Sequence, residues 1–333
     1  MCNKIEQVNS FPVIASVLSP TALAMEISQQ YPIGEVIDCT LLRAYVNDVY
    51  MLKTQSGKYI IKVYRASWRT ESKIRYELEF LFHLHKNGVG VSLPVHKTDG
   101  RLIHPVVAPE GKRYIVLFHF AEGEKPSPPF SDNKYFLLGR ELAKLHKASK
   151  TFNTNYQRFE LNIQYLLDKP LDAIRPFLQE DIGNLTFLEN LSNTVREQIS
   201  CLESKGLSKA ICHGDVSMDN LHYAKNGQIT FYDFDSGGPG WSSYDLLGVY
   251  MFTKYDKRQS RWDAHVKGYQ EVMKLNECDI EALPYLHVMN SIWALGCDAT
   301  IWVQTSGLWR ISKEHLDNRI NSLKNWVETE IDR

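Results

Sequence analysis

Apolar residues follow two different spacings along the first part of the chain. Between Val36 and Tyr64 they fall in short runs, and Gln55-Ser-Gly-Lys58 supplies a glycine-containing turn, so this stretch predicts an antiparallel meander. From Glu71 to Lys86 the spacing becomes three to four residues, which predicts a helix that Asn87-Gly88 ends. A shorter helix is expected before the sheet, with Ser19 as its N-cap. Further strands are expected around 102–107 and 114–120.

The pattern becomes mainly helical after a loop-rich segment. Residues 122–129 hold the densest cluster of loop-forming residues in the chain, and such clusters mark domain boundaries. The sequence therefore predicts an α+β protein with an N-terminal lobe over 1–120, a linker over 121–129 and a C-terminal lobe over 130–333. The first lobe is an antiparallel sheet with one key helix, and the second is helical except around 210–235. Helical patterns are expected at 135–146, 157–168, 185–204, 262–274, 282–303 and 312–329.

Composition and charge narrow the classes of partner. The 333 residues are 44% hydrophobic, enough for about two globular cores, and the formal net charge of -1 gives no overall attraction to nucleic acid or anionic membranes. The six cysteines form no C-x-x-C pair, and the strongest apolar run, 114–121, is far shorter than the roughly 20 residues of a membrane-spanning helix. Residues 1–6 lack the basic start and apolar run of a signal peptide. A cytoplasmic protein that binds neither nucleic acid nor membrane is expected, and its oligomeric state is not indicated.

Two carboxylates and an amide are concentrated in the exceptional segment at 210–235. His213-Gly-Asp215 begins the pattern H-G-D-x-x-x-x-N, which ends at Asn220, and Asp233 follows after a second short apolar run. Phosphoryl transfer needs a group that accepts the proton of the attacking hydroxyl, and it needs oxygen ligands for Mg²⁺. Asp215 suits the first task, whereas Asn220 and Asp233 suit the second. His213 is expected to hold the loop by hydrogen bonds rather than to transfer protons.

A lysine stands in the apolar strand 59–64. Alternation places Ile60 and Lys62 on one face, and a buried lysine is costly without a charge partner. Glu77 on the following helix is the preferred partner, and Glu79 is a competing one. The alternative is an edge-strand lysine whose ammonium group reaches water.

With these motifs in this order, the sequence resembles the aminoglycoside phosphotransferase and choline kinase superfamily, which includes type II homoserine kinases. The resemblance covers most of the chain and implies the two-lobed protein-kinase-like fold, with a nucleotide-binding first lobe. It implies ATP and Mg²⁺ as cofactors, Asp215 as catalytic base, and Asn220 and Asp233 as metal ligands. Lys62 is then expected to contact the α and β phosphates.

The same resemblance suggests further nucleotide contacts and an acceptor. Asn47 is expected at the tip of the hairpin that covers the phosphates, which lacks glycine between 42 and 50. The acceptor site is expected among the C-terminal helices, where Asp298 and Trp302 share a face, although both suit core packing or ion pairing as well. The adenine is expected to meet the backbone around Phe118, His119 and Phe120, between side chains of Ile60, His222 and Tyr232.

Departures from protein kinases favour a small hydroxyl compound as the acceptor. Asp233-Phe-Asp235 ends in aspartate rather than glycine, and only Ser236 to Tyr244 separates it from Asp245, with no A-P-E element. Asp235 is expected to contact either the metal or a neighbouring donor. The alternatives are an atypical Ser/Thr protein kinase, a nucleotide-binding regulatory pseudokinase and, more weakly, a metal-dependent hydrolase. An amino alcohol, homoserine, an amino sugar or an aminoglycoside would each suit the site as acceptor.

Overall fold

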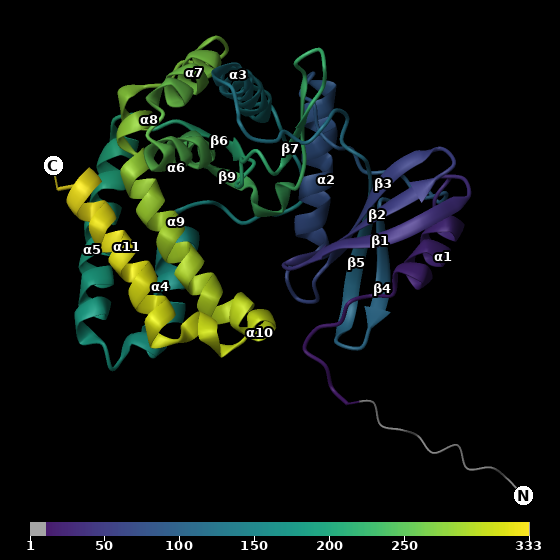
Figure 1. The fold of residues 1–333 in the computed structure, drawn as a ribbon, viewed down its shortest axis with the longest axis horizontal. Helices are drawn as coiled ribbons and strands as arrows, with labels where there is room; N and C mark the ends of the chain where they lie inside the picture. Colours follow the sequence, from purple (N-terminus) through teal and green to yellow (C-terminus); the bar gives the residue numbers. More distant parts are fainter. Residues whose placement is uncertain (1–10, 333) are drawn as a thin grey trace, which may run out of the picture. The chain divides into compact units, whose positions relative to one another are not determined.

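The computed structural model describes residues 11–332, and its residues divide into two compact units (Figure 1). Unit 1 holds the described residues up to Glu71 together with Pro94–Phe120, and unit 2 holds Ser72–Leu93 and the residues from Ala121 onward. The residues of the predicted key helix, except its first residue Glu71, therefore group with unit 2. The assignment of 1–120 to a nucleotide-binding lobe stays a prediction, and the expectation about residues 1–6 lies outside the described residues.

Unit 1 is a five-stranded antiparallel sheet in the order β1-β2-β3-β5-β4. The predicted meander is confirmed, and Gly57 opens β3 at a positive φ of 146°, which L side chains rarely adopt. The predicted first helix, α1 (Pro20–Gln30), is also confirmed, and the Ser19 side chain accepts a hydrogen bond from the Ala22 amide at its N-terminus. The strands are β1 (Val36–Ala44), β2 (Asn47–Thr54), β3 (Gly57–Tyr64), β4 (Ile103–Ala108) and β5 (Gly111–His119).

Helix α1 covers one face of this sheet (Figure 1). Leu23 and Ile27 of α1 are buried in one core cluster with Tyr59, Ile61 and Val63 of β3. Because successive side chains of a strand point to opposite faces, the residues between them lie on the face away from α1. The alternation that was predicted for β3 is therefore confirmed, and it leaves Lys62 outside the α1 core.

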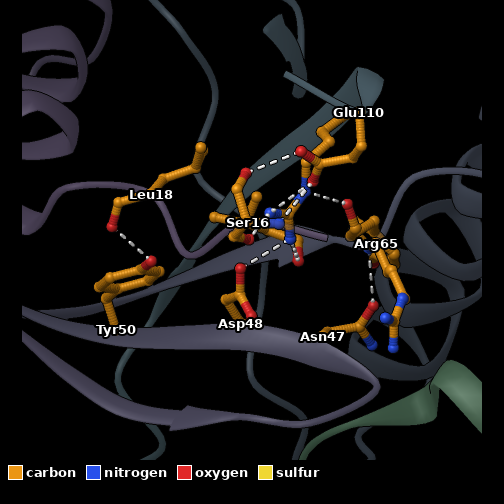
Figure 2. A network of polar contacts seen from close by, with 10 residues as sticks. Ser16, Leu18, Asn47, Asp48, Tyr50, Arg65 and Glu110 are labelled. Carbon is orange, nitrogen blue, oxygen red and sulfur yellow. Dashed lines mark hydrogen bonds and ion pairs between the residues drawn. The ribbon is translucent and has the colours of Figure 1, made fainter. Parts of the chain in front are cut away.

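A buried arginine of the inner strand β5 binds the segment that precedes α1, where Ser16 lies near Asp48 and Glu110 (Figure 2). Arg113 donates to the Asp48 carboxylate at 2.7 Å and to the backbone oxygens of Tyr64 and Ser16 at 3.0 and 2.8 Å. Glu110 lies 3.5 Å from the same guanidinium and accepts hydrogen bonds from the amide and hydroxyl of Ser16. The Arg113 side chain is only 2% exposed, so its charge is balanced inside unit 1 by two carboxylates.

Unit 2 is mainly helical, with four short strands paired as β6 with β9 and β7 with β8. Among the helices of the described residues, none is long and apolar enough to cross a membrane. The helices are α2 (Glu71–Lys86), α3 (Asp132–Ser149), α4 (Lys169–Ile174), α5 (Ile182–Ser204), α6 (Leu247–Asp256), α7 (Gln259–Gln270), α8 (Glu277–Glu281), α9 (Leu283–Cys297), α10 (Val303–Ser306) and α11 (Lys313–Glu330). The strands are β6 (Lys209–Cys212), β7 (Leu221–Tyr223), β8 (Ile229–Phe231) and β9 (Gly238–Trp241).

Helices α3 and α7 pack closely because each places a glycine against the backbone of the other. A Cβ atom on Gly139 would lie 2.0 Å from the backbone oxygen of His265, and one on Gly268 would lie 1.9 Å from that of Phe136. Real Cβ atoms do not approach so near, so any side chain at these positions would force the helices apart. The pair is visible at the top of Figure 1.

Two predicted helices differ from the structure. The pattern at 157–168 predicts a continuous helix, but regular turns begin only at Gln164, with a π-helical segment Gln164–Asp168 that leads into α4. The residues before it are bound elsewhere, since the Leu161 amide donates to the Pro239 oxygen at 2.7 Å. The helix predicted at 282–303 changes to π-helical geometry at Asp298–Trp302, after α9 ends.

Candidate active site

The loop between β6 and β7 brings together two of the predicted site residues. Asp215 is exposed, Asn220 is buried, and the Asn220 side-chain amide donates to the Asp215 carboxylate Oδ2 at 2.7 Å and to the Asp215 backbone oxygen at 3.0 Å. Because the NH₂ group of the amide is directed at Asp215, its Oδ1 atom faces away and keeps its lone pairs. The loop thus presents one carboxylate held by an amide, and the oxygen of that amide.

The start of this loop is held by a buried carboxylate that the sequence analysis did not single out. Asp245 accepts hydrogen bonds from the backbone amides of His213 and Gly214, both at 2.7 Å, and from His146 Nε2 at 2.9 Å. The second nitrogen of His146 lies 2.8 Å from the hydroxyl of Tyr269. A carboxylate that is fully buried would be costly without these donors, so the network fixes the backbone directly before Asp215.

The same region contains a group of potential metal ligands. Within the described part of the chain, ligand atoms of His146, Cys212 and Asp245 lie within 4.8 Å of one another. The Asp245 oxygens already accept three hydrogen bonds, and both nitrogens of His146 are engaged. Complete burial raises the pKa of the Cys212 thiol well above its ordinary value, which disfavours the thiolate that binds metals. We therefore assign this group to hydrogen bonding rather than to a metal.

Asp233 follows β8 in an unusual backbone conformation. Its φ and ψ are 67° and 60°, in the left-handed region that few residues other than glycine adopt. The next residue, Phe234, is buried with its ring centroid 4.3 Å from that of His213. His213 Nε2 lies 3.0 Å from the Tyr232 backbone oxygen, and its Nδ1 accepts from the Asp215 amide at 3.3 Å. The prediction that His213 holds the loop is confirmed by these contacts.

The donor set at this site fits a magnesium ion. Asn220 offers an amide oxygen. Asp233 and Asp235 offer carboxylates, and both residues follow the short strand β8 in the chain. Oxygen ligands of this kind are the ones that Mg²⁺ prefers, together with phosphate oxygens and waters. The metal-binding roles of Asn220 and Asp233 stay predictions, as does the choice between metal contact and hydrogen bonding for Asp235, which is 6% exposed.

The two glutamates proposed as partners of Lys62 differ in their surroundings. Glu77 is 3% exposed and its Oε2 lies 3.7 Å from Nη1 of Arg158. Glu79 is exposed and accepts a hydrogen bond from Thr154. Burial beside a cation favours Glu77 as the residue with a structural or functional task. Its pairing with Lys62 remains a prediction.

In unit 1, Lys62 lies on the face of β3 that is opposite to α1. It is 5% exposed, and its ammonium group lies 4.8 Å from the centroid of the Tyr64 ring. This burial disfavours the alternative of an edge-strand lysine with its charge in water, because β3 lies between β2 and β5. A buried ammonium group on an otherwise apolar strand is a costly feature that is retained where charge is needed.

The residues predicted to surround adenine come from both units. In unit 1, Ile60 and Phe118 are opposite one another in the register of β3 and β5, and His119 at the end of β5 is exposed. Lys58 lies over the Phe120 ring at 5.6 Å. Their contact with a nucleotide stays a prediction.

In unit 2, His222 is fixed by its backbone and ring neighbours. His222 Nδ1 lies 2.9 Å from the backbone oxygen of Ala121, and its ring meets that of Tyr232 edge to face at 5.3 Å. Burial lowers the pKa of His222 below its ordinary value, so a neutral imidazole is favoured. The Tyr232 hydroxyl donates to the backbone oxygen of Asp219 at 2.7 Å. The predicted role of both residues as adenine walls is likewise not tested by these contacts.

Asn47 lies in the hairpin that joins β1 to β2, beyond their last pair, Ala44 with Asp48. Tyr45 and Val46 form the turn, and Asn47 begins β2, pairs with Tyr64 and is 8% exposed. Its side-chain oxygen accepts a hydrogen bond from the Arg65 amide at 3.4 Å (Figure 2). This position at the hairpin tip agrees with the expectation, and contact of Asn47 with phosphate stays a prediction.

The carboxylate considered for the acceptor site is engaged by cationic side chains. Asp298 is fully buried, with Arg310 and His315 each 3.1 Å and Arg319 3.4 Å from its oxygens. This arrangement agrees with the alternative expectation, in which Asp298 pairs with neighbouring basic side chains. The Arg310 guanidinium also lies 5.4 Å from the centroid of the Trp302 ring, so these residues form a packed ionic cluster.

Tyr244, in the turn that follows β9, was noted in the sequence only for its position. Tyr244 is buried, and its hydroxyl donates to the side-chain oxygen of Asn290 on α9 at 2.8 Å. Burial raises the pKa of Tyr244 well above its ordinary value, and the negative charges of Asp245 and Asp215 act in the same direction. The phenol therefore stays protonated and connects α9 to the surroundings of Asp215.

The fold and the loop motif together define the class to which this protein belongs. A five-stranded antiparallel sheet joined to a mainly helical unit, with an H-G-D-x-x-x-x-N loop, defines a protein of kinase-like fold. Residues 38–274 match the phosphotransferase enzyme family, and the chain belongs to this family. The resemblance inferred from the motifs and the predicted fold class are both confirmed.

Individual relatives and structures support the same assignment. An uncharacterized protein of Deinococcus radiodurans is 33% identical over 96% of this chain and 93% of its own length. Amicoumacin kinase of Bacillus subtilis is 24% identical over 72% of this chain and 73% of its own. The structure of an amicoumacin kinase in complex with AMP-PNP, Ca²⁺ and Ami has a TM-score of 0.77 at 17% identity, covering 92% of this chain and 94% of that one. A microcompartment-associated aminopropanol kinase gives a TM-score of 0.73 at 21% identity, over 92% and 95%.

Proposed function

We propose that this protein transfers the γ-phosphoryl group of ATP to a hydroxyl group of a small molecule, with Mg²⁺ as the metal. The observation that carries the proposal is the Asp215–Asn220 contact, in which the amide holds one carboxylate oxygen at 2.7 Å. Asp215 is an exposed residue, and we propose that its carboxylate meets the substrate hydroxyl. Membership of the phosphotransferase family and the small-molecule kinases among its relatives support the reaction class.

Asp215 is the proposed general base. The acceptor oxygen attacks the γ-phosphorus, its proton passes to the Asp215 carboxylate, and the bond between that phosphorus and the β,γ-bridging oxygen breaks to release ADP. Asn220 keeps the carboxylate oriented by donating to Oδ2, and Asp245 keeps the preceding backbone in place through the His213 and Gly214 amides. Orientation of this kind lowers the barrier because the groups need no rearrangement during the reaction.

Asn220 and Asp233 are the residues proposed to hold Mg²⁺, which when bound neutralises phosphate charge. Lys62 is proposed to bind the α and β phosphates, and Glu77 to hold Lys62. The adenine would contact the backbone of 118–120. The proposed walls of its site are Ile60, His222 and Tyr232.

A small acceptor is favoured over a peptide by the chain that follows Asp235. Gly238–Trp241 of this segment forms β9 and pairs with β6, and residues 242–246 continue in a 3₁₀ turn that is buried throughout. The segment is thus used for internal structure. Protein kinases generally dock peptides on a longer activation segment, so this arrangement supports a compact acceptor such as an amino alcohol, homoserine, an amino sugar or an aminoglycoside.

The test is an acceptor screen with purified protein and Mg·ATP. We expect one or more small alcohols to stimulate nucleoside diphosphate release above the rate with water alone, with the phosphate recovered on oxygen. The stimulation should disappear in Asp215→Ala. Efficient phosphorylation of a protein substrate that depends on Asp215, with no stimulation by the small alcohols, would replace this proposal by a protein kinase.

A further inference from the structure

Arg158 binds the backbone that follows the proposed metal ligand Asp233. Its side chain is 1% exposed. Nε donates to the oxygen of Gly237 at 2.7 Å, and Nη2 donates to the oxygens of Phe234 and Asp235 at 2.9 and 2.7 Å. The three acceptors all lie within four residues of Asp233, so a single planar group fixes the path of the chain there.

The same guanidinium also reaches helix α2. Nη1 donates to the backbone oxygen of Lys73 at 2.9 Å and lies 3.7 Å from Oε2 of Glu77. Four hydrogen bonds and one ion pair thus match the five N–H groups of an arginine, which are arranged in a rigid fork. A lysine has three donors on one atom and cannot reach the same five oxygens. The site is therefore specific for arginine.

The backbone at Asp233 gives this contact a functional consequence. A left-handed conformation at a residue other than glycine persists only where its surroundings fix it. We propose that Arg158 is a positioning residue that holds Asp233 ready for Mg²⁺ before metal and nucleotide arrive. It acts through the carbonyl groups of Phe234, Asp235 and Gly237 rather than by touching substrate. This inference rests on the proposed metal-binding role of Asp233.

The experiment compares metal-dependent with metal-free nucleotide binding in Arg158→Lys. We expect the affinity for Mg·AMP-PNP, measured by calorimetry, to fall about 10–100-fold, the range for residues that orient metal ligands. Binding of AMP-PNP in EDTA should change much less, since lysine keeps a positive charge beside Glu77 and the residues proposed to contact the nucleotide are not altered. The Mg²⁺ concentration that gives half-maximal turnover should rise in parallel.

Arg261→Lys is the matched control. The Arg261 side chain is 6% exposed, pairs with Asp256 and donates to the oxygen of Phe130 at 3.1 Å, so it is another buried arginine of unit 2 that binds a carboxylate and a carbonyl. Both variants should lower the melting temperature, but only Arg158→Lys should change the Mg²⁺ dependence. Equal Mg·AMP-PNP affinity in Arg158→Lys and the wild type, or parallel loss of metal-free binding, overturns the inference.

Hydrogen exchange in the wild type decides the question if the variant does not fold. A loop held by Arg158 should protect the Gly237 amide, which donates to the Phe234 oxygen at 3.0 Å, already in the free protein. Protection that appears only after Mg·AMP-PNP is added overturns the inference. Asp233→Ala separates the two proposals: unchanged Mg²⁺ dependence there refutes the metal role itself, whereas its loss in Asp233→Ala but not in Arg158→Lys refutes only the role of Arg158.

Discussion

Arg113 in unit 1 and Arg158 in unit 2 use the same chemistry for different ends. Both side chains are at most 2% exposed, and both donate to carbonyl groups of segments that are distant in sequence. Arg113 lies beside two carboxylates, those of Asp48 and Glu110, whereas Glu77 is the carboxylate beside Arg158.

The difference shows how the context of a buried guanidinium decides its role. The backbone acceptors of Arg113 are at the end of β3 and in the segment before α1, so its loss removes support for the architecture of unit 1. The acceptors of Arg158 follow the proposed metal ligand, so its loss is expected to reach the chemistry. A buried ion cluster is therefore informative about function only when the segments that it joins are known.

The largest effect on stability is expected for Arg113→Met. Removing this cation takes away the guanidinium that contacts both Asp48 and Glu110, and breaking a buried pair in this way costs about 3–5 kcal/mol of unfolding free energy. Urea unfolding measures the loss. Arg101→Met is the control, because the Arg101 side chain is 62% exposed and pairs with Asp99, so it should cost less than about 1 kcal/mol. A similar loss of unfolding free energy in both variants would show that Arg113 stabilises the protein no more than an exposed arginine does.

The two buried arginines keep their charge at every accessible pH. A buried histidine does not, so the pH dependence of stability tests a buried group of a different kind. His265 in unit 2 is fully buried, and burial lowers its pKa from 6.5 to about 4. Between these values the unfolded state binds the proton and the folded state does not, so stability falls as the pH falls from 6.5 to 4. The loss from this residue is on the order of 3 kcal/mol.

Urea unfolding at several pH values between 7.5 and 4.5 measures this slope. His287, whose pKa burial also lowers to about 4, contributes in the same direction and will keep part of the slope in His265→Gln. The variant should nevertheless lose less stability on acidification than the wild type. Parallel curves for the two proteins would show that His265 is protonated in the folded state.

Asp215→Ala gives the loss of turnover expected when the proposed general base itself is removed. Turnover should fall at least about a hundredfold, equivalent to about 2.7 kcal/mol of transition-state stabilisation, while nucleotide affinity changes little. Asp219→Ala is the control on the same loop, because the Asp219 side chain is 81% exposed and pairs with Lys125. Steady-state kinetics and calorimetry on both variants give the result. Unchanged turnover in Asp215→Ala would exclude its role as base.

The smallest predicted effect is a coupling free energy, which shows whether Glu77 interacts with Lys62 or with Arg158. Residues that act as one unit show coupling of about 0.5–3 kcal/mol in a double-mutant cycle. We expect Lys62→Met and Glu77→Gln to be coupled in Mg·ATP binding, and Arg158→Lys and Glu77→Gln to be coupled in the unfolding free energy. Additive effects on Mg·ATP binding would separate Lys62 from Glu77, and stronger coupling to Glu79→Gln would assign the partner there.

Local patterns were sufficient for the parts of the molecule that depend on neighbouring residues. The alternation along 59–64 correctly put Lys62 and Ile60 on one face, because a strand has a fixed period of two, and the α1 core lies on the other face. The motif H-G-D-x-x-x-x-N places Asn220 five residues after Asp215 in one loop, where they form a hydrogen bond. The fold class and the family followed from such local signals taken in order.

Long-range contacts decided what the sequence left open or suggested wrongly. The apolar spacing at 157–168 predicted a helix, but Arg158 binds carbonyl groups 76 to 79 residues away. Asp245 is separated by about 30 residues from the amides that it holds. Backbone carbonyls and amides are the same in every residue, so the partners of Arg158 and Asp245 carry no signature in the sequence. The sequence determined which groups are available for chemistry, and only the tertiary structure decided what keeps them in place.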